Sequence, residues 1–142
     1  MATKKPRTSP AVNTVLGLDH LVLRVRDLAA SIAFYKAVLG ARVERQLQTP
    51  RIVQLRIGES LLDLVPGRTS TSNNPNLDHF AVRVANFDAA ALTRRLSRHG
   101  IEPGEVRERY GSEGYGPSIY FPDPDGNVVE VKGPAVRPRI RR

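Results

Sequence analysis

The chain has 142 residues, of which 40% are hydrophobic and 25% are charged, and this composition suits one globular domain with a sizeable core. It contains no cysteine, which excludes disulfides, thiolate metal ligands and a cysteine nucleophile. It has no apolar run of about 18 residues, and its basic first residues lack the apolar core of a secretory signal. We therefore expect a cytoplasmic protein without a membrane span.

The formal net charge of +8 is concentrated near the two ends of the sequence. Basic residues without any acidic neighbour occupy the first residues and the stretch after position 136. The sequence between them is nearly neutral and has none of the motifs that read nucleic acid, which argues against a specific nucleic-acid-binding protein. We expect residues 1–15 and 133–142 to be disordered basic tails that touch polyanions only weakly.

The first predicted module spans residues 16–65 and has the order β-α-β-β-β. Asp27 is a suitable N-cap for its helix, which runs to about Leu39 and ends at Gly40. The apolar stripe expected along this helix comprises Leu28, Ile32, Tyr35 and Leu39. Strands are expected over residues 16–25, 43–47, 53–57 and 61–65, where apolar side chains dominate or alternate with polar ones.

A polar, turn-rich linker at residues 66–76 precedes a second module over residues 77–132 with the same order of elements. Its helix is expected from Asp88 to His99, with Gly100 ending it. The inward-facing residues of this helix are expected to be Ala89, Leu92 and Leu96. Strands are expected over residues 77–84, near Glu105, and over 118–121 and 128–131, the last two joined by a Pro-Asp-Pro-Asp-Gly-Asn turn.

The two modules share an eight-residue frame, LDHLVLRV at residues 18–25 and LDHFAVRV at residues 77–84. Residues i, i+2 and i+4 of a strand lie on one face, so His20 neighbours Arg24 and His79 neighbours Arg83. Histidine and arginine together on a short strand make a poor core. We expect them to form the wall of a cleft.

Each module also carries one carboxylate inside its last strand, Asp63 in the first and Glu130 in the second. A buried carboxylate is costly unless it is paired or binds a metal. Together with His20 and His79, these residues suit a catalytic divalent metal such as Zn, Ni, Mn or Fe(II). Alternatively, the histidines are structural, Asp63 caps a turn or pairs with Arg56, and Glu130 pairs with an arginine.

Three further residues are candidates for substrate binding. Arg24 shares the face of His20, where a guanidinium would bind a carboxylate or phosphate in a bidentate way. Residues 107–116 are rich in glycine, tyrosine and charge, which predicts a mobile loop. That loop is either a lid that uses Arg109 and Tyr110 to capture substrate or an ordinary exposed connection.

The LDH frame, the Arg-Asp-Leu and Ala-Ser-Ile-x-Phe-Tyr helix that follow it, and the closing turn and strand at residues 122–130 resemble the vicinal oxygen chelate superfamily. This superfamily includes glyoxalase I, extradiol dioxygenases, methylmalonyl-CoA epimerase, fosfomycin-resistance thiol transferases and bleomycin-resistance proteins. The resemblance covers residues 16–132 and implies an α+β fold, in which two βαβββ modules form a curled mixed sheet around one metal. It also implies a homodimer.

By position, the resemblance implies that His20, His79 and Glu130 bind the metal. Asp63 stands where glyoxalase I has a glutamate and the epimerase a glutamine, and its shorter side chain departs from that pattern. Arg24 matches an arginine that binds a carboxylate of the glutathione adduct in glyoxalase I.

We therefore expect a metal-dependent enzyme that acts on a small, oxygen-rich, anionic molecule by a glyoxalase-like isomerisation or a dioxygenase-like ring cleavage. Asp63 or Glu130 would move the proton as general base. The alternatives are a metal-free protein that binds a small molecule or antibiotic, and a fosfomycin-type thiol transferase.

Overall fold

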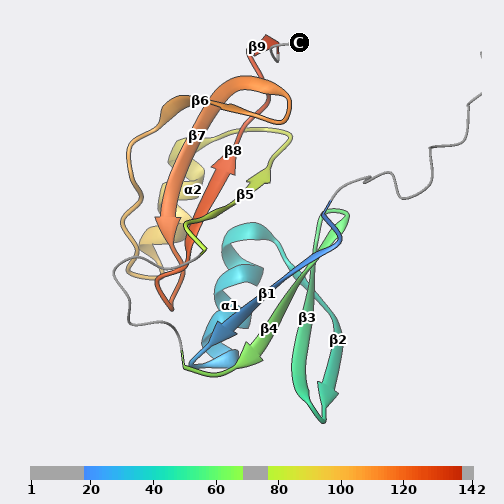
Figure 1. The fold of residues 1–142 in the computed structure, drawn as a ribbon. Coiled ribbons are helices and arrows are strands. Elements are labelled where there is room, and N and C mark those ends of the chain that lie inside the picture. The colour runs from blue at the N-terminus through green and yellow to red at the C-terminus, as the bar shows by residue number, and fades with distance from the viewer. Residues whose placement is uncertain (1–17, 69–76, 139–142) are drawn as a thin grey trace, which may run out of the picture.

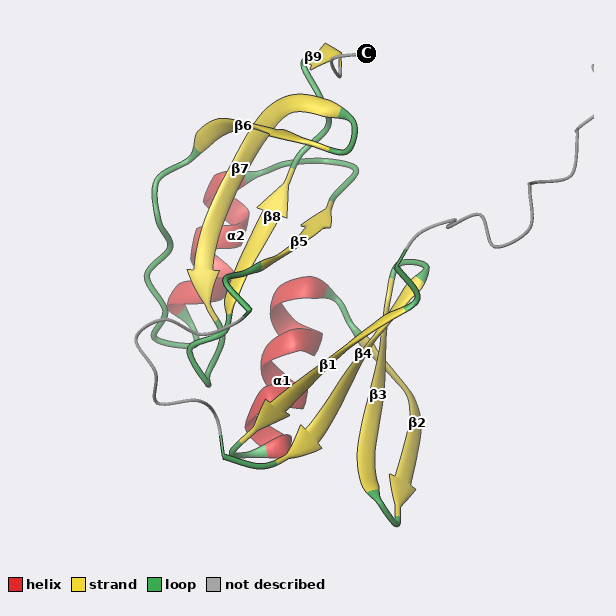
Figure 2. Ribbon diagram, in the orientation of Figure 1, coloured by secondary structure: helices red, strands yellow, loops and turns green. Residues whose placement is uncertain are grey.

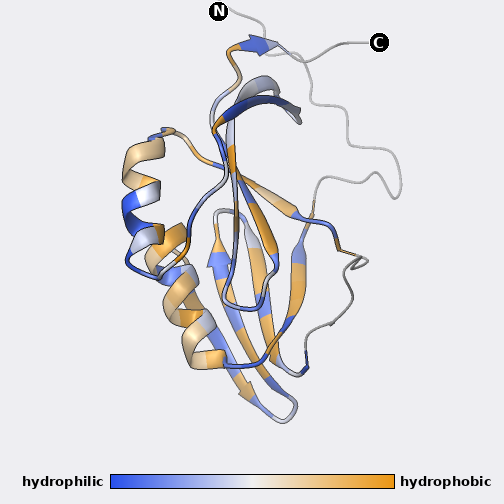
Figure 3. Cartoon of the chain, turned by 90° about the vertical axis from the view of Figure 1, so that its left-hand side faces the viewer, coloured by the Kyte–Doolittle hydropathy of each residue, from blue (hydrophilic) through white to orange (hydrophobic). Residues whose placement is uncertain are grey.

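A computed structural model describes residues 18–68 and 77–138. Within these ranges the chain forms two modules, each with one helix packed on one β-sheet, which confirms the α+β class and the βαβββ order (Figure 1 and Figure 2). The two helices contact each other and lie on the same side of the two sheets (Figure 3). No helix in the described ranges is long and apolar enough to cross a membrane.

The first module is a four-stranded sheet with strand order β1-β4-β3-β2. Its elements are β1 (His20–Val25), α1 (Leu28–Leu39), β2 (Arg42–Gln48), β3 (Arg51–Ile57) and β4 (Ser60–Pro66). The edge strand β1 runs parallel to β4, whereas the other pairs are antiparallel. Residues 16 and 17 of the first predicted strand, the tail 1–15 and most of the linker lie outside the described residues.

The second module repeats this arrangement in the order β5-β8-β7-β6. Its elements are β5 (Phe80–Arg83), α2 (Ala89–Ser97), β6 (Arg107–Gly111), β7 (Gly114–Pro122) and β8 (Val128–Lys132), followed by the short β9 (Arg137–Pro138). Strand β9 pairs with β7, so the prediction of a disordered tail from residue 133 is wrong at this point.

Both helices begin as predicted. The side chain of Asp27 accepts a hydrogen bond from the Ala30 amide at 3.0 Å, and Asp88 accepts one from the Ala91 amide at 2.9 Å. Helix α1 ends at Gly40, whose φ of 66° is easily adopted only by glycine. The buried face of α1 consists of Leu28, Ser31, Phe34, Tyr35 and Val38. The predicted stripe is therefore half right, because Ile32 and Leu39 are only partly buried beside it.

A single apolar cluster joins the two modules. Alternate residues of β1, β4, β7 and β8 point towards the helices, and Figure 3 shows apolar segments of the strands alternating with polar ones. The Phe34 ring of α1 lies 6.3 Å from the Phe121 ring of β7, across the boundary between the modules. Because this face of each sheet is occupied by the core, the opposite face carries the polar residues of the predicted site.

The turn between β7 and β8 connects the two modules with hydrogen bonds, which confirms its predicted role as turn architecture. The buried carboxylate of Asp123 accepts hydrogen bonds from the Tyr35 hydroxyl at 2.7 Å and from the Asn127 amide at 2.8 Å. Asp125 accepts one from the backbone amide of Arg26 at 2.9 Å. Burial, followed by the charge of Asp123, raises the pKa of Tyr35 well above its usual range.

Candidate metal centre

The two histidines of the repeated frame are held in the same way. Nδ1 of His20 lies 2.6 Å from Oδ1 of Asp19, and Nδ1 of His79 lies 2.6 Å from Oδ1 of Asp78. A carboxylate beside Nδ1 places the proton there and leaves the Nε2 lone pair available to a metal. The hydrogen bond to Asp19 also raises the pKa of His20.

Neither aspartate is among the residues predicted above to act at the site. The signal was available, because an aspartate directly precedes the histidine in both copies of the frame.

His79 and Glu130 come together as predicted. The Nε2 atom of His79 lies 3.4 Å from Oε2 of Glu130, whose side chain is only 8% exposed. Strand β5 runs parallel to β8 with Ala81 opposite Glu130, which brings the histidine two residues earlier to the carboxylate. Two donor atoms that are each about 2.1 Å from a tetrahedral metal are about 3.4 Å apart. This pair therefore fits two positions of a divalent metal.

His20 and Asp63 occupy the equivalent positions of the first module, since Val22 lies opposite Asp63 in the parallel pair of β1 and β4. Asp63 is 7% exposed and accepts a hydrogen bond from Nε2 of Gln54 at 3.0 Å. Its other oxygen, Oδ1, is buried and has no hydrogen-bond partner in the part of the chain that the structure describes. A buried acceptor in this state is costly, so Oδ1 is available to a ligand.

The alternative pairing of Asp63 with Arg56 is wrong. Arg56 instead forms a two-pronged ion pair with Glu44, with contacts of 2.6 and 2.8 Å. The guanidinium prefers a carboxylate that can accept in a bidentate way at the sheet surface.

We call the pair His20 and Asp63 one half-site and the pair His79 and Glu130 the other. These two half-sites do not meet within one chain. In residues 18–68 and 77–138, no group of three or more histidine, cysteine, aspartate or glutamate side chains lies close enough to hold a metal ion. Figure 1 shows β1 and β5 on different sheets. One chain thus brings together two of the predicted ligands, His79 and Glu130, and leaves His20 and Asp63 on the other sheet.

An arginine and a tyrosine complete the surroundings of His79. The Tyr120 ring stands edge-on to the imidazole with a centroid distance of 5.1 Å. The Arg109 guanidinium lies 4.4 Å from the centre of the Tyr120 ring and donates to the Ser118 hydroxyl at 2.8 Å. Burial and the charge of Glu130 raise the pKa of Tyr120, so its phenol stays protonated at neutral pH. Arg109 was predicted from sequence, whereas Tyr120 was not.

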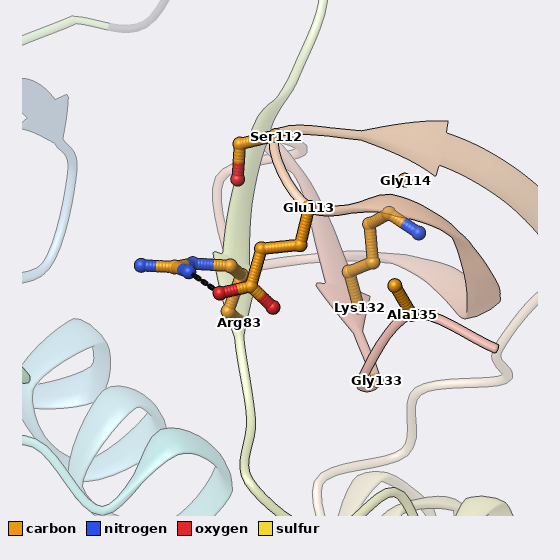
Figure 4. A pocket seen from close by; sticks show the side chains of 7 residues that line it. All are labelled: Arg83, Ser112, Glu113, Gly114, Lys132, Gly133 and Ala135. Atoms are coloured by element: carbon orange, nitrogen blue, oxygen red, sulfur yellow. Dashed lines mark hydrogen bonds and ion pairs between the residues drawn. The ribbon is translucent and has the colours of Figure 1, made fainter. Parts of the chain in front are cut away.

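The other basic side chains on these faces behave differently. Arg24 is exposed and packs its alkyl chain near Gly67, without an ion pair to any residue in the described ranges. Arg83, its counterpart in the second module, forms an ion pair with Glu113 (Figure 4). The ring of Tyr110 packs against Tyr115 at 5.0 Å.

The prediction of a mobile loop at residues 107–116 is wrong. These residues form most of a β-hairpin in which β6 pairs with β7, and residues 112 and 113 make the turn. The glycines of this segment are required by the hairpin and do not indicate a hinge. Gly114 adopts a φ of 118°, which favours glycine. At Gly116, a Cβ would clash with the Pro134 carbonyl oxygen. A lid built from this segment is no longer supported.

Comparisons with known proteins show the family and the fold of the chain. The sequence pattern that defines the glyoxalase/bleomycin resistance protein/dioxygenase superfamily matches residues 17–131. The chain is 31% identical over 122 residues to the glutathione transferase FosA of Serratia marcescens, covering 80% of this chain and 78% of FosA. It is 27% identical over 129 residues to the metallothiol transferase FosB of Bacillus licheniformis, covering 91% of this chain and 82% of FosB.

A solved structure of the fosfomycin resistance protein FosX of Listeria monocytogenes superposes with a TM-score of 0.73 at 25% identity, covering 91% of this chain and all of that one. Another FosX structure, at 24% identity and a TM-score of 0.70, covers 87% of this chain and 94% of that one. It is a complex with Mn(II) and 1S,2S-dihydroxypropylphosphonic acid.

Proposed function

Because the chain belongs to the glyoxalase/bleomycin resistance protein/dioxygenase superfamily, we propose that it is a divalent-metal-dependent enzyme that opens the epoxide of a small phosphonate such as fosfomycin. The observation that carries this proposal is the pair of His79 and Glu130, whose donor atoms are spaced as two ligands of one metal. The similarity to FosA and FosB supports the reaction class, which was the alternative among the functions expected from sequence.

We propose that the third metal ligand is His20 of a second copy of the chain. Strands β1 and β5 are both at the edge of their sheets, and an uncovered sheet edge invites pairing with another chain. In a symmetric dimer the His20 face of each copy would meet the His79–Glu130 face of the other, which gives two equal sites. Manganese, which FosX binds, is the metal we would test first.

The residues around this centre suit an anionic substrate. When bound, the metal would supply a Lewis acid that polarises a substrate oxygen. The Arg109 guanidinium would neutralise the phosphonate, while the protonated Tyr120 hydroxyl, which hydrogen-bonds Glu130, would hold that carboxylate in place. Oδ1 of Asp63, buried on the His20 half-site, is the atom best placed to accept a proton from water or from a thiol. Arg24 and Tyr110 remain candidates for holding the rest of the substrate.

Turnover of fosfomycin tests this function. Manganese-loaded protein with fosfomycin is expected to give either the diol, or an adduct when glutathione or another thiol is added, both visible by phosphorus NMR. Protein with Glu130→Gln is the matched control, because the change removes one charge and keeps the shape. An unchanged phosphonate signal with every thiol and in water would contradict the proposal.

A catechol dioxygenase activity is the second candidate. The chain is 30% identical over 129 residues to the catechol-2,3-dioxygenase of Bacillus subtilis, covering 86% of this chain and 42% of that enzyme. Oxygen uptake by the Fe(II)-loaded protein with catechol distinguishes this reaction from epoxide opening.

Arg109 is expected to act in substrate binding. Replacing it with alanine should raise the Michaelis constant for fosfomycin about 10-fold and leave manganese affinity unchanged, since one charged contact is lost. Arg107→Ala is the matched control, because Arg107 lies on the same hairpin and pairs with Glu105. Equal Michaelis constants for the two variants would remove Arg109 from the site.

A further inference from the structure

The buried carboxylate of Asp63 has a neutral partner, although two arginines lie on its face of the sheet. Gln54 lies directly opposite Asp63 in the antiparallel pair of β3 and β4, and its side-chain amide donates to Oδ2 at 3.0 Å. Oδ1 has no partner in the part of the chain that the structure describes. Arg24 and Arg56 share this sheet face, and a guanidinium is a usual partner of a buried carboxylate. That neither of them binds Oδ1 requires a physical reason.

Arg56 is close enough to Asp63 for the two side chains to pair. It lies opposite Leu61 in the pairing of β3 with β4, and Leu61 is two residues before Asp63. Arg56 is therefore a diagonal neighbour of Asp63. Diagonal neighbours on one sheet face are about 7–8 Å apart, which is within the reach of a long side chain. The register alone would thus permit an ion pair between Arg56 and Asp63.

Glu44, in the edge strand β2, binds the Arg56 guanidinium on the side away from Asp63. Its carboxylate accepts hydrogen bonds from Nε of Arg56 at 2.6 Å and from Nη2 at 2.8 Å. The backbone carbonyl oxygen of Glu59 accepts one from Nη1 at 3.0 Å, so all three nitrogens of the guanidinium are occupied. The hydrogen bonds from Arg56 also lower the pKa of Glu44, so the carboxylate is ionised at neutral pH.

Arg24 is directed away from Asp63 by packing. Its Cδ lies 3.3 Å from the position that a Cβ at Gly67 would occupy, so its alkyl chain lies against the backbone just after β4. An ion pair with either arginine would occupy Oδ1 and stabilise the ionised carboxylate, which would make Asp63 a weaker proton acceptor. The neutral amide of Gln54 fixes the carboxylate and leaves Oδ1 free.

We propose that Glu44 is a positioning residue for the proposed reaction: it binds Arg56 and thereby leaves Oδ1 of Asp63 free to accept a proton. Glu44 lies two strands away from Asp63 and acts through Arg56. Its side chain is 44% exposed, so the fold should tolerate its replacement. The placement of Arg56 stands on the contacts within the sheet, and only the catalytic consequence rests on the proposed function.

Turnover of fosfomycin by manganese-loaded variants tests the catalytic consequence. In Glu44→Ala the released Arg56 should pair with Asp63, so kcat should fall at least about 10-fold while the Michaelis constant and manganese affinity stay unchanged. Adding Arg56→Met should restore kcat, which would not happen after a purely structural loss. Glu59→Ala is the matched control, because it removes the same charge from the adjoining turn and keeps the carbonyl that binds Arg56. A parent-like kcat in Glu44→Ala, or a double variant that stays slow, would overturn the proposal.

Thermal unfolding tests the placement of Arg56 without any substrate. In the parent protein, Asp63→Asn and Arg56→Met should shift the melting temperature additively, because the two side chains are not paired. In Glu44→Ala the same two substitutions should be coupled by about 4 °C or more, since Arg56 is then free to pair with Asp63. Additive shifts in Glu44→Ala, or coupling of this size in the parent, would refute the proposal.

Together, the two experiments separate this proposal from the proposed function. Coupling in Glu44→Ala without any turnover of fosfomycin by the parent would contradict the proposed function and the catalytic role of Glu44, and would still support the binding of Arg56 by Glu44. Turnover by the parent with a kcat that does not respond to Glu44→Ala would instead support the proposed function and exclude Glu44 as a positioning residue.

Discussion

Replacing His79 with alanine is expected to lower the affinity for Mn2+ by about 100-fold or more, because it removes one of the donor atoms at the centre. The imidazole is oriented by Asp78 and lies 3.4 Å from the Glu130 carboxylate, so the variant leaves a buried glutamate without its neighbour. Titration calorimetry measures the change.

His99→Ala is the matched control for this variant. His99 follows α2, and its ring lies 5.7 Å from the ring of Phe34 in the core cluster, away from both half-sites. Its replacement should leave manganese affinity unchanged. A His79→Ala protein that binds manganese as tightly as the parent would exclude this histidine as a ligand.

The second large effect is expected on stability, from Asp123→Ala. Asp123 is 4% exposed and accepts hydrogen bonds from the Tyr35 hydroxyl, two backbone amides and the Asn127 side chain. Its removal leaves these donors buried without an acceptor, which should lower the free energy of unfolding by about 3 kcal/mol. Urea denaturation measures this loss, and a value near that of a surface substitution such as Glu102→Ala would contradict it.

Tyr35→Phe tests how much the hydrogen bond from the Tyr35 hydroxyl to Asp123 contributes to stability. It removes one donor and should cost about 1 kcal/mol. The folded protein holds the Tyr35 proton more tightly than the unfolded chain, since the pKa of Tyr35 is raised by burial and by Asp123. The unfolded chain therefore binds fewer protons above about pH 10, and stability falls as the pH rises past that value. This part of the fall should disappear in Tyr35→Phe.

The local structure of the fold was predictable because local chemistry specifies it. Asp27 and Gly40 bound α1 through capping interactions that depend on neighbouring residues alone. The hairpin at residues 107–116 was not predicted, since glycine, tyrosine and charge are typical of loops and the pairing of β6 with β7 is a tertiary interaction. The partner of Arg56 was missed for a similar reason: Glu44 lies on another strand, and only the pairing of β2 with β3 brings it to the guanidinium.

For the candidate site, the sequence repeat identified the possible metal ligands but not the distances between those of the first module and those of the second. Equivalent positions in two modules pointed to His20, Asp63, His79 and Glu130, and the register of β1 with β4 and of β5 with β8 is indeed the same. Whether the two halves meet depends on how the modules pack. A repeated pattern does not contain that information, and in one chain the halves remain on separate sheets.

The central claim is a metal centre assembled from the His20 half-site of one chain and the His79–Glu130 half-site of another. Mixing the variants His20→Ala and His79→Ala, each of which should bind manganese only weakly on its own, tests it most directly. After subunit exchange, a heterodimer would contain one intact site, so the mixture should bind about one manganese ion per four chains. A mixture that binds no more manganese than the separate variants would contradict the shared centre.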